Sequence, residues 1–138
     1  MNSTYSFEQK QDYLYLTISG DYNKDDFRRF PKIIMDECEK TGAEKVLINA
    51  LNVSGTNVPA MERFYMGEEI ARVIGSKVKI AVAWPEKDIN KFAENVAVNR
   101  GGNICVLGDL VSAENWLLAV QERKASTDFQ IRPSASSS

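Results

Sequence analysis

The chain has 138 residues, a length that suits one domain with its own hydrophobic core. Seventeen lysines and arginines against 19 aspartates and glutamates give a formal charge of −2, and the absence of a strongly basic segment argues against nucleic-acid binding. The sequence contains no histidine, which excludes the commonest general base and every metal site that needs an imidazole.

Two short strands are predicted near the N-terminus, at residues 5–7 and 13–19. In the second strand, Leu14, Leu16 and Ile18 alternate with tyrosines and a threonine. This period of two residues is typical of a strand with one buried face. The polar residues between the two segments predict a short connection, so we expect an antiparallel pair at one edge of the sheet.

A helix is predicted over residues 25–40, and Gly42 lies where the helix should stop. Pro31 falls within this window, and proline removes a backbone donor from a helix. We therefore expect either that the helix begins near Arg29 or that it kinks at the proline. The nearly continuous apolar run 46–51 then predicts a strand that is buried on both faces.

The rest of the chain predicts alternating helices and strands: a helix over 59–74, a strand over 78–84, a helix from 88 to about 100, a strand over 104–107, and a helix that starts between 109 and 112. This alternation favours an α/β fold with a mixed, largely parallel β-sheet and about four helices. We expect one domain over residues 1–122. The polar segment 123–138 predicts a disordered tail.

The predicted helix 59–74 carries apolar residues on two sides. One stripe is expected to face the sheet, and its members are Ala60, Phe64, Gly67, Ala71 and Ile74. Met61 and Tyr65 project from nearly the opposite side, with Met66 and Val73 on one flank. Either neighbouring loops cover Met61 and Tyr65, or these residues form a contact surface for a partner or a second copy of the chain.

The order of these elements resembles a known family. The segments that carry the likeness are residues 63–71, 77–82, 92–93, 99–101 and 113–117, within a match of about residues 5–120. Together they resemble the STAS fold of bacterial anti-sigma-factor antagonists, and more narrowly the SpoIIAA-like branch that is described as having STAS or SEC14-type domains.

This resemblance implies a non-enzymatic protein-interaction module with a protein partner, such as an anti-sigma factor or a kinase-like protein. In the family, the start of the corresponding helix docks on the partner, and a serine or threonine there is phosphorylated to abolish docking. Here the implied partner-binding residues are Ser54, Thr56, Asn57, Met61 and Tyr65, with Ser54 and Thr56 as phosphorylation sites. The acidic residue that usually precedes the phosphorylated residue is missing. The alternative is that Ser54, Thr56 or Asn57 only shapes the loop and caps the helix.

A second hypothesis is a SEC14-like carrier of a lipid or other small apolar ligand, with Trp84, Tyr65 and Phe92 as pocket walls. A third is an enzyme that uses Asp21, Asp25 or Tyr22. No phosphate-binding glycine loop or nucleophile motif supports catalysis, so no enzyme, cofactor or metal is predicted.

The remaining expectations concern location and assembly. No leader peptide or membrane-spanning segment is predicted, which favours a cytoplasmic protein. Cys38 lies between Glu37 and Glu39, whose charges should raise the pKa of its thiol, so it is a poor nucleophile. A homodimer through the exposed side of the helix 59–74 would compete with the protein partner for the same surface.

Overall fold

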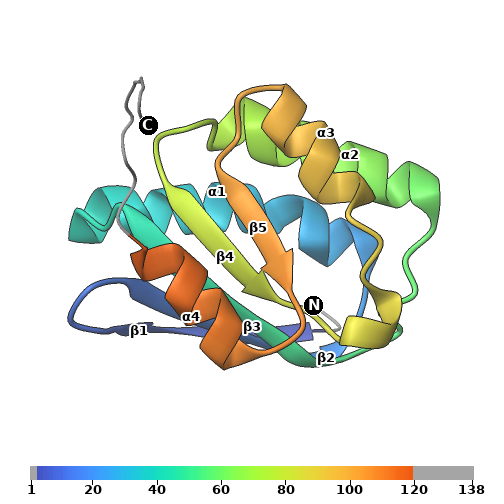
Figure 1. The fold of residues 1–138 in the computed structure, drawn as a ribbon, viewed down its shortest axis with the longest axis horizontal. Coiled ribbons are helices and arrows are strands. Elements are labelled where there is room, and N and C mark those ends of the chain that lie inside the picture. The colour runs from blue at the N-terminus through green and yellow to red at the C-terminus, as the bar shows by residue number, and fades with distance from the viewer. Residues whose placement is uncertain (1–2, 120–138) are drawn as a thin grey trace, which may run out of the picture.

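The computed structural model describes residues 3–119, and within them the predicted mixed α/β fold is confirmed. A five-stranded sheet is covered by four α-helices and a short 3₁₀ turn (Figure 1). In chain order the elements are β1 (Ser3–Gln9), β2 (Leu14–Asp21), α1 (Lys24–Thr41), β3 (Lys45–Ser54), α2 (Ala60–Val73), β4 (Lys79–Ala83), the 3₁₀ turn η1 (Glu86–Asp88), α3 (Phe92–Asn99), β5 (Ile104–Leu107) and α4 (Leu110–Leu118).

The strands lie in the order β1-β2-β3-β4-β5. Only the β1–β2 pair is antiparallel, and each later pair is parallel. The pairing of β2 with β3 shifts register between Thr17 and Ser19, so that Asp21 and Ser54 end opposite each other. Strand β3 therefore runs three residues beyond its predicted end, and this extension brings Ser54 to the edge of the loop before α2.

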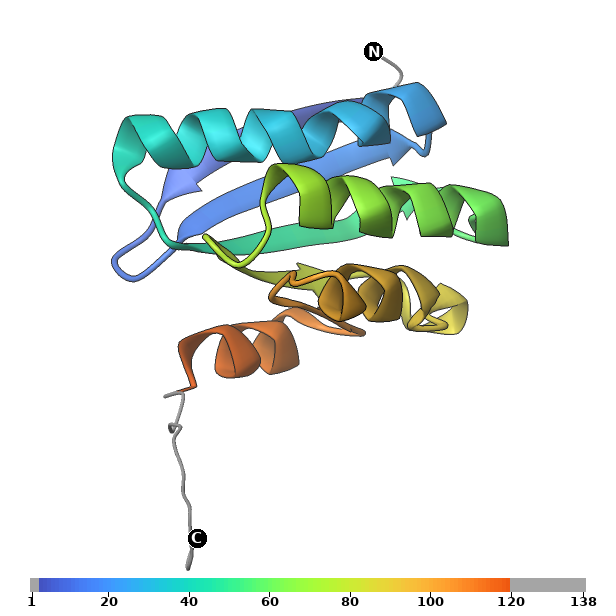
Figure 2. The same ribbon diagram turned by 90° about the horizontal axis from the view of Figure 1, so that it is seen from above.

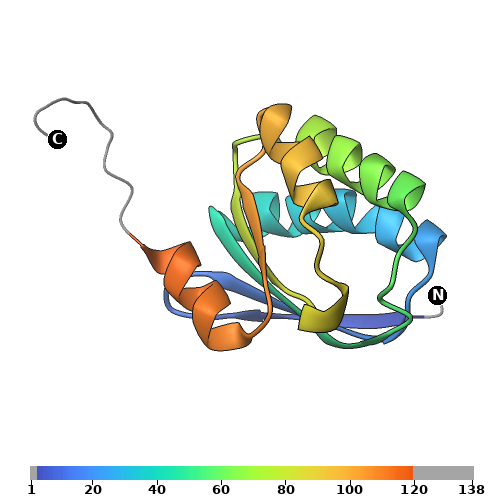
Figure 3. The same ribbon diagram turned by 45° about the vertical axis from the view of Figure 1, so that its right-hand side comes forward.

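The helices form two unequal layers. In Figure 2, α1, α2 and α3 follow one another across one face of the sheet, and Figure 3 shows α4 on the other face. The larger core lies under α1, α2 and α3 and includes Leu16, Ile34 and Ile80. The smaller core lies under α4 and includes Leu47 and Leu117. Burial on both faces explains the nearly continuous apolar sequence of β3 and β4.

Helix α1 begins before its proline. The side chain of Asn23 caps the helix, since its Oδ1 accepts hydrogen bonds from the backbone N–H groups of Asp25 and Asp26, both at 3.0 Å. The helix continues past Pro31 to Thr41, so a start near Arg29 was wrong. Asn23 explains the earlier start, because the cap satisfies donors that would otherwise lack partners.

The prediction for the inner side of α2 was partly wrong. Arg63 and Gly67 are the fully buried residues of the helix, while Ala60 is exposed. A Cβ added to Gly67 would lie 2.6 Å from the carbonyl oxygen of Ala93 in α3. Gly67 thus permits close contact with a neighbouring helix instead of the sheet. Met66 and Val73, which were expected on a flank, pack against the main core.

Helix α3 begins later than predicted, at Phe92. Asp88 lies in the 3₁₀ turn η1 instead of opening the helix. The predicted tail 123–138 lies outside the described residues. Within residues 3–119, no helix is both long enough and apolar enough to span a bilayer.

Candidate functional site

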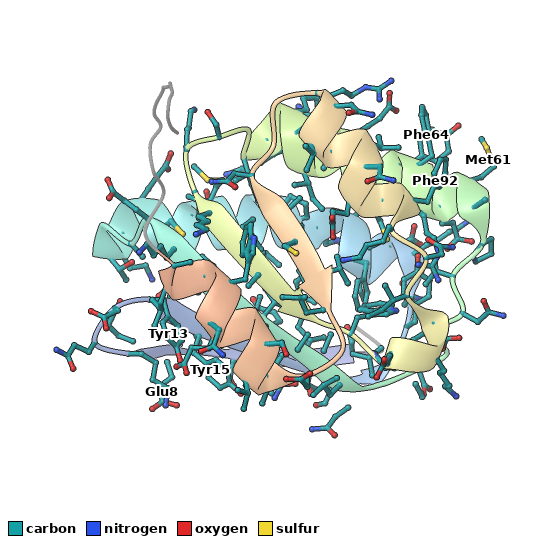
Figure 4. All side chains as sticks on the ribbon, viewed as in Figure 1. Glu8, Tyr13, Tyr15, Met61, Phe64 and Phe92 are labelled. Carbon is teal, nitrogen blue, oxygen red and sulfur yellow. The ribbon has the colours of Figure 1, made fainter. Side chains whose placement is uncertain are left out.

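Four apolar or aromatic side chains gather at the N-terminal ends of α2 and α3. We call Met61, Phe64, Tyr65 and Phe92 the α2–α3 patch. Met61 is 61% exposed, and Tyr65 and Phe92 are also exposed. The ring of Phe64 stacks on that of Phe92 with centroids 6.5 Å apart, and the rings of Phe64 and Tyr65 lie edge to face with centroids 5.7 Å apart. Figure 4 shows Met61, Phe64 and Phe92 at the same corner of the molecule.

Arginines border this patch. The guanidinium of Arg28 in α1 lies 5.5 Å from the centroid of the Tyr65 ring, and that of Arg100 lies 5.4 Å from the centroid of Phe64. Arg100 also pairs with Glu68 at 3.5 Å. An apolar centre with a charged rim is the usual composition of a protein-binding surface. The sequence left open whether neighbouring loops cover Met61 and Tyr65, and both side chains are exposed. Phe64, which was expected to face the sheet, lies beside Tyr65 instead.

The three predicted loop residues occupy different environments. Ser54 and Asn57 are exposed. The hydroxyl of Ser54 donates a 2.5 Å hydrogen bond to Oδ1 of Asp21, so a carboxylate lies beside this serine although none precedes it in the sequence. Thr56 is only 4% exposed, and its hydroxyl donates a 2.6 Å hydrogen bond to Oδ2 of Asp88. Thr56 is therefore part of the interior, in contrast to its predicted place on the partner-binding surface.

The third hypothesis, an enzyme, named Asp21, Asp25 and Tyr22. Asp21 accepts the hydrogen bond from Ser54, and Asp25 is exposed in the first turn of α1. The Tyr22 hydroxyl donates a 2.7 Å hydrogen bond to Glu62. Burial, that hydrogen bond and the negative charge of Glu62 raise the pKa of Tyr22 well above its ordinary value. The phenol therefore keeps its proton at neutral pH and is a poor base.

Residues 3–119 contain no group of three aspartate, glutamate or cysteine side chains that could hold a metal ion. Cys38 is buried, and burial together with the charges of Glu37 and Glu39 raises the pKa of its thiol to about 11. Burial also raises the pKa of Cys105. Both thiols are therefore mostly protonated at neutral pH, a poor state for a nucleophile.

A second site lies inside the domain, between the sheet and helices α1, α2 and α3. It is a cavity of about 110 Å³ with a mostly aliphatic and aromatic lining, which includes Ile18, Phe27, Met66, Ile70, Ile80 and Trp84. Of the three predicted pocket walls, only Trp84 lines it. Tyr65 lines a separate open groove with Arg28, Glu68 and Glu69, and Phe92 lines neither.

Two polar groups of this cavity lining have unusual surroundings. Trp84 is 7% exposed, and its indole Nε1 has no hydrogen-bond partner. Arg63 is also 7% exposed, and its guanidinium donates to the carbonyl oxygens of Val58 at 2.7 Å and Asp88 at 2.8 Å. The sequence analysis missed Arg63. The available signal was its position three and seven residues before the core-facing Met66 and Ile70, a spacing that places Arg63 on the same side of the helix.

Comparison with solved structures finds a likeness in fold. The chain is similar to the crystal structure of an uncharacterized protein from the DUF3478 family, with a SpoIIAA-like fold, from Shewanella loihica PV-4. The sequences are 19% identical, the match covers 84% of this chain and 93% of that protein, and the TM-score is 0.49. This likeness carries no assignment of function.

No family model matches the sequence, and no curated protein matches it. The functional assignment therefore depends on the α2–α3 patch and the cavity.

Proposed function

We propose that this protein is a non-enzymatic interaction module that docks on a protein partner through the α2–α3 patch. The observation that carries the proposal is the 61% exposure of Met61 next to three contiguous aromatic rings. Exposed apolar clusters with a polar rim are common at protein-binding sites. Methionine adapts its shape to a partner, and tyrosine supplies a large contact area with little loss of side-chain entropy.

Ser54 is the residue at which we propose regulation by phosphorylation. Its hydroxyl is exposed and lies beside the carboxylate of Asp21. A phosphate there would add a charge of about −1.5 to −2 and would repel that carboxylate. The repulsion would separate the ends of β2 and β3, from which the chain continues into the loop before α2. Thr56 is a poorer substrate, because its hydroxyl is buried and bonded to Asp88.

The proposal is tested by quantitative capture of partners from cells that express the protein naturally, with the bait at its native abundance. The variants are Met61→Asp and Tyr65→Asp. The matched control is Val111→Asp, because Val111 is a 71% exposed apolar residue of α4 on the other face of the sheet. A stoichiometric partner that Val111→Asp retains and both patch variants lose supports the proposal. A partner set that is the same for all three variants contradicts it.

Self-association through the same patch is measured separately. Sedimentation of the purified protein determines whether it forms a homodimer, and Met61→Asp would then convert the dimer to a monomer. In that case the second copy, and not a different protein, occupies the α2–α3 patch.

The cavity favours a second candidate function, a carrier of a small apolar ligand. The space lies between the sheet and helices α1, α2 and α3 and is lined chiefly by apolar side chains, as small-molecule sites usually are. Native mass spectrometry of freshly purified protein tests this function. A bound mass that Ile70→Trp removes, while the fold is retained, supports a carrier. The mass of the protein alone under gentle conditions counts against it.

A further inference from the structure

The side chains that line the cavity indicate the chemical class of its ligand. The buried Nε1–H of Trp84 is a donor without a partner, and a buried donor that lacks an acceptor costs about 1–3 kcal/mol. It is the one buried side-chain nitrogen or oxygen atom without a hydrogen-bond partner in residues 3–119. A ligand oxygen in the cavity would supply the missing acceptor.

In the part of the chain that the structure describes, the acidic residues that line the cavity have partners of opposite charge, and the arginines that line it do not. The two lining acids already have cationic partners, since Glu94 pairs with Lys91 at 3.1 Å and Glu69 pairs with Arg72. The two lining arginines, Arg28 and Arg63, have no carboxylate at ion-pair distance within residues 3–119. The cavity therefore has an excess of positive charge.

Arg63 is the more informative of these arginines. Arg28 is exposed, so water solvates its charge, but Arg63 is buried. Its hydrogen bonds run to the backbone carbonyl oxygens of Val58, Thr56 and Asp88, which are neutral acceptors. A buried cation usually has an anionic partner, because removal from water is costly. An anion in the cavity would supply that partner.

We propose that the cavity binds a small apolar carboxylate. The hydrocarbon body fills the aliphatic space between the sheet and α1, α2 and α3. The carboxylate accepts a hydrogen bond from Nε1 of Trp84 and is neutralised by Arg63 and Arg28. This inference rests on the carrier function proposed above and adds the chemical class of the ligand. It does not depend on the α2–α3 patch.

The size of the cavity limits the ligand. An engineered apolar cavity of about 150 Å³ holds benzene. The cavity here, at about 110 Å³, is somewhat smaller. A hydrocarbon body of about four to six carbons is therefore the expected size.

The two tryptophans allow a direct test by NMR with ¹⁵N-labelled protein. Trp84 lines the cavity, whereas Trp116 belongs to α4 and packs against the smaller core on the other face of the sheet, so its indole signal is an internal control. The probes are hexanoate, 1-hexanol as the neutral match and hexylammonium as the match of opposite charge. Hexanoate is expected to shift the Trp84 Nε1–H signal and not that of Trp116, with an affinity about tenfold or more above that of 1-hexanol.

Each outcome distinguishes the ligand class from the carrier function. Equal affinities for hexanoate and 1-hexanol would leave the carrier function standing and overturn the carboxylate. Tighter binding of hexylammonium than of hexanoate would also overturn the carboxylate and leave the carrier function standing. If no probe shifts the Trp84 signal, both the carboxylate and the carrier function are overturned.

Two variants locate the binding groups. Arg28→Gln changes an exposed side chain, so the fold is expected to persist and the preference for hexanoate over 1-hexanol is expected to fall several-fold. Trp84→Phe keeps an aromatic ring but removes the donor, and it is expected to weaken hexanoate about tenfold. An unchanged hexanoate affinity in both variants would overturn the proposed contacts, with circular dichroism as the check on folding.

Discussion

The hydroxyl of Thr56 donates a 2.6 Å hydrogen bond to Oδ2 of Asp88, which joins the loop before α2 to the 3₁₀ turn before α3. Thr56→Val keeps the shape of the side chain but removes the donor. We expect a loss of about 1–2 kcal/mol in the free energy of unfolding. Ser54→Ala, which removes the exposed hydroxyl two residues earlier, is the control and should change it by less than about 0.5 kcal/mol. Urea unfolding measures both, and equal effects would contradict the different roles of the two hydroxyls.

Gly67 is expected to resist substitution. Gly→Ala in the middle of a helix ordinarily stabilises by about 1 kcal/mol. Here the new Cβ would lie 2.6 Å from the carbonyl oxygen of Ala93 and 2.8 Å from Cβ of Val96. We therefore expect Gly67→Ala to lower the free energy of unfolding by about 1–3 kcal/mol, because α2 and α3 must move apart. A gain in stability in urea unfolding would show that the two helices are not in this close contact.

The hydroxyl of Tyr13, the residue before β2, donates a 2.6 Å hydrogen bond to Glu114 of α4. Burial, this hydrogen bond and the charge of Glu114 raise the pKa of Tyr13 to about 12. Glu114→Gln removes the charge, so the pKa should fall toward its ordinary value of about 10. The ¹³Cζ resonance of Tyr13, followed by NMR against pH, measures the change. An unchanged midpoint would show that Glu114 does not contact Tyr13 in solution.

The raised pKa of Tyr13, which burial and then the hydrogen bond to Glu114 cause, predicts a dependence of stability on pH. The pKa of Tyr13 is higher in the folded state than in the unfolded chain, so the folded state holds the proton more tightly. The stabilisation is fully present below about pH 10 and is lost as the pH rises toward about 12. Tyr13→Phe should reduce this alkaline loss in urea unfolding at pH 9 and pH 11.5. An equal loss in the wild type and the variant would assign it to other groups.

Cys38 should react slowly while the protein is folded. Its pKa is raised to about 11, so little thiolate exists at pH 8, and its side chain is buried. We expect iodoacetamide to label Cys38 far more slowly in buffer than in 6 M guanidinium chloride, as measured by peptide mass spectrometry. Fast labelling of the folded protein would contradict the burial of this thiol.

The sequence predicted the architecture because hydrophobic periodicity depends on local spacing. A few consecutive residues are enough to show which face of a strand is buried. Examples are the alternation of Leu14, Leu16 and Ile18 in β2 and the apolar runs of β3 and β4. Element boundaries were less accurate. Asn23 starts α1 before Pro31, and the η1 turn delays α3 until Phe92, because a cap or turn depends on individual hydrogen bonds.

The candidate site was predicted only in part, because it depends on contacts between distant segments. The helical spacing of Met61 and Tyr65 placed them away from the sheet but left open whether neighbouring loops cover them. The stacking of Phe92 on Phe64 needs the packing of α3 on α2, which Gly67 permits. The difference between the exposed Ser54 and the buried Thr56 likewise depends on Asp21 and Asp88, which are far away in sequence.

The most direct test of docking through the α2–α3 patch is photo-cross-linking in cells that express the protein naturally. A photoreactive phenylalanine replaces Met61 in one variant and Val111 in the other, since both positions are exposed apolar residues on different faces of the domain. We predict one discrete cross-linked protein of stoichiometric yield from position 61 and none from position 111. The same products from both positions, or none from position 61, would contradict the proposed docking surface.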